Sequence, residues 1–174
     1  NYAVGINGGI DVITHSIRLG VDKYITKREA NNELPTRALV SVDIKNMFNA
    51  ISRQKLRQLI SESFPSLSAF ADLLYDEPGM IRLKLDDGTW DEHPVPEGFT
   101  QGCPISPIFA GLVLGDILTR IDEELYDKTG RRLRSGHTGD DGKGGLALIM
   151  AYVDDVNCLL PLEDVKFFLD RFKF

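Results

Sequence analysis

Two adjacent aspartates interrupt an apolar run near the end of the chain, in AYVDDVNCLL (151–160). An ionised carboxylate buried without a partner is strongly unfavourable, so the fold must bring these side chains to water, a donor or a cation. The flanking segments LALIMAYV (146–153) and VNCLL (156–160) are short, apolar and typical of buried strands. The sequence therefore predicts a tight hairpin with Asp154 and Asp155 at its tip.

A third aspartate, Asp43, ends another segment that is typical of a buried strand, ALVSVDI (38–44). If strands 38–43 and 148–153 are neighbours, their ends lie about 5 Å apart, and Asp43 converges with Asp154. The ordinary explanation is a turn that tolerates Asp. The alternative is that carboxylates of neighbouring strands hold two Mg²⁺ ions about 4 Å apart, as in displacement at phosphorus. We favour the metal site because of the third carboxylate.

Several other segments have helical patterns. Apolar residues recur at helical spacing from Ile10 to Tyr24, and Ser52 is a suitable cap for the next helix. We also expect helices over Leu67–Tyr75, from Pro104 to about Tyr126, and from Pro161 onwards. Pro104 would lie in the first turn of its helix, where a missing N–H costs nothing, and Ile108 on its apolar face.

MIRLKLDDGTWDEHPV (80–95) predicts a β-hairpin, because its apolar and basic residues alternate before the turn signal Asp87-Gly88. Residues 128–145 are rich in glycine and charge and predict a loop. Trp90 and Phe99 could stack on bases, although we expect Trp90 to pack against its own hairpin. Hairpins and helical crossovers both join the strands, which predicts an α+β sheet with helices packed on one face.

The chain has 174 residues, 43% of them hydrophobic, which suits one compact domain or a piece of a larger one. It begins at Asn1 without a methionine and stops within a helical pattern, so we interpret it as an internal fragment. No apolar run approaches the ~20 residues that a membrane span needs. Cys103 and Cys158 have neither metal-ligand spacing nor a disulfide pattern, so we expect a reducing, intracellular setting.

The formal net charge of −6 argues against a surface that attracts nucleic acid everywhere. Two basic tracks, KYITKR (23–28) and RRLR (131–134), remain candidates for local phosphate contact. Most such clusters are simply solvated faces.

Three segments resemble, in order, the central sequence blocks of reverse transcriptases: SVDIKNMFNA (41–50), PEGFTQGCPISPIFAGLVLGDIL (96–118) and AYVDDV (151–156). The second contains Gln-Gly-x-Pro-x-Ser-Pro, and the third contains Tyr-x-Asp-Asp. The opening YAVGINGGIDVITHSIRL (2–19) looks like the segment that precedes the first block in non-LTR retrotransposon enzymes. The resemblance implies that residues 1–174 form a polymerase palm, with a ferredoxin-like antiparallel sheet and part of the fingers, lacking the thumb and outer fingers.

The resemblance also implies a role for each matched residue. Asp43 and Asp154 would be the principal ligands of two Mg²⁺ ions, which Mn²⁺ could replace, and Asp155 would be more peripheral. The residues implied in nucleotide binding are Ile44, Phe48, Gln101 and Gly102, and those implied beside primer and template are Tyr152, Gln101 and Pro104. Ser106 would cap the following helix rather than touch substrate.

The implied activity is that of an RNA-directed DNA polymerase, which adds deoxynucleotides to a primer 3′-hydroxyl. Its partners would be an RNA template, a DNA primer and deoxynucleoside triphosphates, with no membrane. Phe48 falls where the family places an aromatic ring under the sugar, so that a 2′-hydroxyl is excluded; the alternative is that Phe48 is a core residue. We expect the isolated fragment to be inactive.

Two alternatives remain open at this point. The chain could come from a group II intron maturase-type or other cellular reverse transcriptase. It could also be a palm that binds RNA without catalysis, although the intact aspartates count against that.

Overall fold

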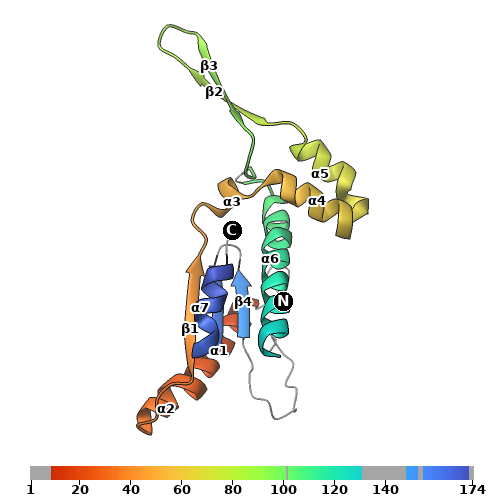
Figure 1. The fold of residues 1–174 in the computed structure, drawn as a ribbon. Helices are drawn as coiled ribbons and strands as arrows, with labels where there is room; N and C mark the ends of the chain where they lie inside the picture. Colours follow the sequence, from red (N-terminus) through yellow and green to blue (C-terminus); the bar gives the residue numbers. More distant parts are fainter. Residues whose placement is uncertain (1–8, 101, 131–147, 153–154, 173–174) are drawn as a thin grey trace. The chain divides into compact units, whose positions relative to one another are not determined.

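The computed structural model describes residues 9–100, 102–130, 148–152 and 155–172, and it confirms the α+β class. Its elements are α1 (Gly9–Val21), the π-helix η1 (Asp22–Thr26), α2 (Lys27–Ala30), β1 (Arg37–Asp43), α3 (Met47–Ala50), α4 (Arg53–Ser63), the 3₁₀ helix η2 (Pro65–Leu67), α5 (Ser68–Tyr75), β2 (Gly79–Lys84), β3 (Trp90–Val95), α6 (Ser106–Thr129), β4 (Leu148–Tyr152), β5 (Asp155–Pro161) and α7 (Leu162–Arg171) (Figure 1). None of the helices in these ranges is long and apolar enough to cross a membrane.

The chain divides into two compact units. One, called here the sheet unit, consists of Asn1–Lys45 and Gly115–Phe174. The other, the helix–hairpin unit, is the continuous segment Asn46–Leu114.

The sheet unit contains a three-stranded antiparallel sheet in the order β1-β5-β4. The condition that we set above, that strands 38–43 and 148–153 are neighbours, does not hold, because β5 lies between them. The reason is burial: Val156, Cys158 and Leu160 on β5 are completely buried, which suits the central strand. β1 was expected to be buried, but most of its residues alternate between half-buried and exposed.

The two faces of the sheet differ in polarity. Val156, Cys158 and Leu160 share the buried face, and the opposite face carries Leu159 together with a polar end. Helix α1 approaches that opposite face, since a Cβ added to Gly20 would lie 2.7 Å from Leu159 Cδ2. The sheet is therefore covered on both faces near Leu159, whereas we expected helices on one face only.

Helix α7 contacts β1 and β5 and lies beside the second half of α6. An ion pair of 2.9 Å joins Arg171 Nε to Glu124 Oε2, and the guanidinium of Arg171 also lies 5.7 Å from the centre of the Phe167 ring. Phe168 is buried and stacks on Phe172. The helix predicted from Pro161 onwards is confirmed.

The helix–hairpin unit has a core of aromatic side chains. Tyr75 stacks on Phe99 with 4.9 Å between ring centres, and Phe109 meets both rings edge-on. The predicted cap of α4 is confirmed, because the Ser52 hydroxyl accepts a hydrogen bond of 3.3 Å from the Lys55 N–H.

Helix α6 begins at Ser106, so Pro104 lies in the turn before it and not in its first turn as predicted. Ser106, expected to cap the helix, is its first residue, and its buried hydroxyl donates to the Thr100 carbonyl. The apolar face of α6 also differs from the prediction, because Phe109 is buried and Ile108 is exposed.

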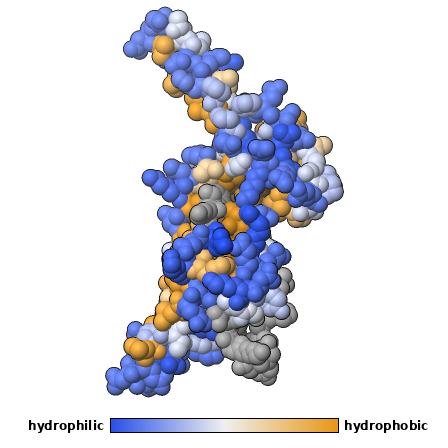
Figure 2. Space-filling view, viewed as in Figure 1, coloured by the Kyte–Doolittle hydropathy of each residue, from blue (hydrophilic) through white to orange (hydrophobic). Residues whose placement is uncertain are grey.

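The predicted hairpin is confirmed as β2 and β3, with Gly88 in the left-handed conformation that its turn requires (φ 84°). Trp90 does not pack against the hairpin as expected; it is 59% exposed. Its partner across the strands is Lys84, and the hairpin forms a two-stranded sheet of its own. Figure 2 shows hydrophobic and hydrophilic residues side by side on its surface.

Candidate active site

Asp43 and Asp155 face each other at one end of the sheet, as direct partners in the β1–β5 register. Opposite residues of an antiparallel pair have Cα atoms about 4.5–5.5 Å apart and side chains on the same face. Both aspartates are exposed. Like charges directly opposite each other destabilise a sheet, so this pair calls for a neutralising partner.

The structure pairs Asp43 with Asp155, whereas we predicted that Asp43 converges with Asp154. Asp155 is the first residue of β5, not a residue of the hairpin tip, and Tyr152 is its register partner on β4. Asp154 and Gln101 lie outside the described residues, so the predicted approach of Asp43 to Asp154 stays a prediction. The carboxylate that the structure brings to Asp43 is that of Asp155.

The nearest polar pair on the same face is Ser41 and Asn157, which are also register partners. The Ser41 hydroxyl donates a hydrogen bond of 2.6 Å to Asn157 Oδ1. No ion pair joins Asp43 or Asp155 to a basic side chain in the described part of the chain. The end of the sheet thus carries two carboxylates, one amide and one hydroxyl, and each of these groups contains oxygen.

Two carboxylates are fewer ligands than a closed metal site holds. Within the described ranges, no three His, Cys, Asp or Glu side chains are grouped closely enough to hold a metal ion. Mg²⁺ needs only one or two carboxylates when waters and substrate phosphates complete its shell. The exposed pair Asp43–Asp155 fits that requirement.

A second group of predicted residues lies in the helix–hairpin unit, around Phe48. Phe48 is half-buried, whereas its neighbour Met47 is buried, so part of Phe48 stays accessible. The Phe99 N–H donates a hydrogen bond of 2.5 Å to the Phe48 carbonyl. This bond holds Phe99 beside Phe48. Phe99 itself is buried and cannot stack on a base.

Gly98 makes this close approach possible. Its φ of 79° is left-handed, and an added Cβ would lie 2.7–2.9 Å from backbone atoms of Asn49. The Gly98 N–H also donates to the Ile51 carbonyl at 2.8 Å. Backbone contacts therefore hold the loop around Gly98 against the segment after Phe48.

Arg53 reinforces the same junction, and sequence reasoning missed it. The side-chain Nε of Arg53 donates to the Gly98 carbonyl at 2.7 Å, and the backbone N–H of Arg53 donates to Glu97 Oε2 at 3.0 Å. The buried guanidinium also reaches the Glu77 carbonyl and lies over the Tyr75 ring. A single arginine at the start of a helix is no sequence signal, since most such residues are solvated.

The other predicted contacts are placed as follows. Gly102 is exposed with φ 84°, and apart from its chain neighbours no atom of the described residues lies within 4 Å of an added Cβ, so its backbone is open to a ligand. Pro104 is exposed, and the Ile44 side chain is buried, which leaves only the Ile44 backbone for a nucleotide.

The basic track at residues 23–28 is largely paired. Lys27 forms an ion pair with Asp22 at 3.0 Å, and Arg28 forms one with Glu33 at 3.1 Å. These contacts favour a solvated face over a phosphate site. The other track, residues 131–134, lies outside the described residues.

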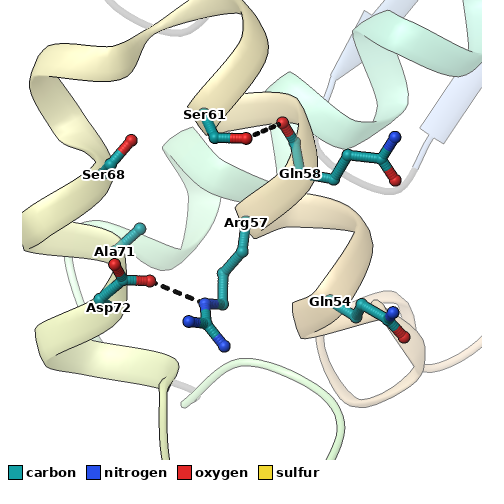
Figure 3. A pocket seen from close by; sticks show the side chains of 7 residues that line it. All are labelled: Gln54, Arg57, Gln58, Ser61, Ser68, Ala71 and Asp72. Carbon is teal, nitrogen blue, oxygen red and sulfur yellow. Dashed lines mark hydrogen bonds and ion pairs between the residues drawn. The ribbon is translucent and has the colours of Figure 1, made fainter.

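A polar groove of about 350 Å³ lies between α4 and α5 (Figure 3). Its lining residues are Gln54, Arg57, Gln58, Ser61, Ser68, Ala71 and Asp72. Arg57 spans one wall and donates to Asp72 at 2.7 Å, a bond that raises the pKa of Arg57. None of the predicted site residues lines this groove, so it is distinct from the candidate active site.

Of family models, curated proteins and solved structures, only solved structures match the chain. No family model and no curated protein matches the sequence. Telomerase from Candida tropicalis, in complex with the TWJ fragment of telomeric RNA, superposes with a TM-score of 0.60 at 13% identity, over 92% of this chain and 26% of that one. Telomerase from Candida albicans in the same kind of complex gives 0.58 at 13% identity, over 90% and 28%. The apo form from Candida tropicalis gives 0.56 at 13% identity, over 92% and 28%.

These matches show the fold alone, and the chain spans little more than a quarter of the telomerase chains. Its own length, in contrast, is almost completely covered. The chain therefore shares its fold with part of these telomerase chains.

Proposed function

We propose that the chain is the palm, with part of the fingers, of an RNA-directed DNA polymerase. This nucleotidyltransferase would add deoxynucleotides to the 3′-hydroxyl of a primer. The observation that carries the proposal is the register pairing of Asp43 with Asp155 on a reverse-transcriptase-like fold. The residue before Asp155 is Asp154, so a third carboxylate is adjacent in the sequence.

Asp43, Asp154 and Asp155 would hold two Mg²⁺ ions, which Mn²⁺ could replace. Two facing carboxylates repel each other, and a divalent cation removes that repulsion. When bound, the ions would lower the pKa of the primer hydroxyl and neutralise charge on the leaving pyrophosphate. The aspartates would supply the fixed negative charge that holds the ions, and the hydrogen bond between Ser41 and Asn157 supports the strand pair beneath them.

The incoming deoxynucleotide would contact Phe48, Gln101, Gly102 and the Ile44 backbone. Support comes from the half-buried Phe48 ring and from the bond that ties Phe99 to the Phe48 carbonyl. An aromatic ring beneath the sugar leaves no space for a 2′-hydroxyl. Tyr152 and Pro104 would lie beside primer and template.

The template would be RNA and the primer DNA. Support for RNA comes from the sequence blocks and from the two matched telomerases, whose structures are complexes with telomeric RNA. The opening segment favours a non-LTR retroelement as the source, acting inside the cell. Electrostatics and positioning, rather than covalent chemistry by side chains, would provide the rate.

The test is primer extension on an RNA template by this chain together with its flanking thumb and fingers. Asp43→Asn and Asp155→Asn should each abolish Mg²⁺-dependent synthesis, whereas Asp170→Asn, an exposed aspartate paired with Lys166, should retain it. Full activity of Asp43→Asn would contradict the proposal. Tight RNA binding by the unmodified protein without any synthesis would instead indicate a non-catalytic RNA-binding palm.

A further inference from the structure

The β2–β3 hairpin has two chemically different faces. The register places Met80, Arg82, Lys84, Trp90, Glu92 and Pro94 on one face, called here the Trp90 face. The opposite face carries Ile81, Leu83, Asp91 and His93. A basic and aromatic surface thus lies back to back with an apolar and acidic one.

Trp90 is the exposed aromatic surface of its face. It is 59% exposed, and no ring contact joins it to another aromatic or cationic side chain in the described ranges. Lys84 is its direct partner across the strands, and Arg82 follows on the same face. Arg82 is partly neutralised by Glu92 at 2.8 Å, so the face keeps an excess of positive charge in a chain of net charge −6.

We propose that the Trp90 face binds single-stranded nucleic acid, with a base stacked on the indole and phosphates beside Lys84 and Arg82. Such sites combine an aromatic platform with cations along the backbone, and they tolerate any base. The proposal takes its partner class from the proposed function but concerns a different part of the chain. The opposite face is unsuited, because Asp91 occupies it and accepts a hydrogen bond from His93 when that ring nitrogen is protonated.

Trp90 is the single tryptophan of the sequence, so its fluorescence reports on this face without any label. The first measurement titrates the 174-residue chain with an oligothymidylate of about ten nucleotides, within the site sizes of single-strand binders. Stacking should quench Trp90 emission in step with binding measured by anisotropy. Affinity should fall with salt, because each neutralised phosphate contributes a slope of about −0.7 for single strands.

Variants separate the face from the hairpin as a whole. Trp90→Ala should weaken binding about five-fold or more. Leu83 lies on the opposite face and is 51% exposed, so Leu83→Ala should leave the affinity for the oligothymidylate unchanged. Lys84→Gln should reduce the salt slope by about 0.7, whereas the same charge removal at exposed Lys166 should not.

Three outcomes would overturn the proposal. Binding without quenching places the nucleic acid elsewhere, and equal losses in Trp90→Ala and Leu83→Ala indicate only that the hairpin must fold. A Trp90 emission that shifts with protein concentration alone assigns the face to a second copy of this chain. The proposed polymerase function is tested separately by Asp43→Asn, so either idea can fail while the other stands.

Discussion

Ser41 on β1 donates a hydrogen bond of 2.6 Å to Asn157 on β5, two positions along each strand from Asp43 and Asp155. Because both pairs lie on the same face, this bond holds the strands in the register that sets the two carboxylates opposite each other. A neutral polar pair thus secures the geometry of a charged one.

Loss of this bond should be measurable. Ser41→Ala should lower the free energy of unfolding by about 1 kcal/mol, the usual contribution of one hydrogen bond. The control is Ser61→Ala, since that hydroxyl only donates to a carbonyl of its own helix, Gln58. Urea denaturation of both variants checks this, and equal losses would contradict a role of Ser41 in strand pairing.

Asp43→Asn should stabilise the metal-free chain. It removes the repulsion from Asp155, so the free energy of unfolding should rise by about 0.5 kcal/mol at low salt, and less at high salt. Added Mg²⁺ should then stabilise the unmodified chain more than the variant. Thermal unfolding with EDTA or with Mg²⁺ measures both effects; a variant less stable than the unmodified chain in EDTA would show that the carboxylates do not repel.

Gly98→Ala should be more destabilising than Gly88→Ala, although both glycines have similar positive φ values. At Gly88 an added Cβ meets nothing within 4 Å, so only the left-handed conformation costs energy, about 1–2 kcal/mol. At Gly98 the Cβ would also collide with Asn49 backbone atoms at 2.7–2.9 Å. Denaturation of the pair isolates the collision, and equal losses would show that the loop can move away.

Local patterns predicted most elements of this fold. The Asp87-Gly88 turn and the Ser52 cap depend on neighbours in the sequence, and both are confirmed. The condition that strands 38–43 and 148–153 are neighbours failed, because only long-range packing decides that β5 lies between β1 and β4. The register pairing of Asp43 with Asp155 follows from this strand order, and the predicted approach of Asp43 to Asp154 stays a prediction.

The contacts that Arg53 and Gly98 make near Phe48 could not be predicted from the sequence. Arg53 and Gly98 act through backbone carbonyls, which carry no sequence signature, and their partners come from separate segments. Trp90 shows the opposite error. An aromatic residue in a hairpin pattern suggests packing, but a two-stranded sheet offers it no second layer.

The two cysteines should differ sharply in reactivity. Burial raises the pKa of the Cys158 thiol to about 12, whereas a hydrogen bond from the Ile105 backbone lowers the pKa of Cys103. Iodoacetamide at neutral pH should therefore modify Cys103 in the folded chain, and Cys158 only after unfolding. Mass spectrometry of the two peptides checks this, and rapid labelling of Cys158 would show that its strand opens readily.

The same burial predicts a pH dependence of stability. The unfolded chain releases the Cys158 proton near the ordinary pKa of 9.0, while the folded chain keeps it, so the free energy of unfolding should fall as pH rises above about 9. The loss should continue towards pH 12, where the folded thiol also ionises. Cys158→Ala is less stable overall because of the cavity it leaves, but its decline above pH 9 should be flatter. An unchanged decline would assign it to other groups.

The division of the chain has a consequence for its synthesis. Ser41 and Asn157 are 116 residues apart, whereas the helix–hairpin unit is one uninterrupted segment between them. On a ribosome, that segment can complete its contacts before β5 has been translated, since domains generally fold as they emerge. The two aspartates can meet only afterwards, once β5 has been translated, and closing so distant a pair is slow. A nascent chain that stalls before β5 would thus contain a folded helix–hairpin unit, but Asp43 would have no partner on β5.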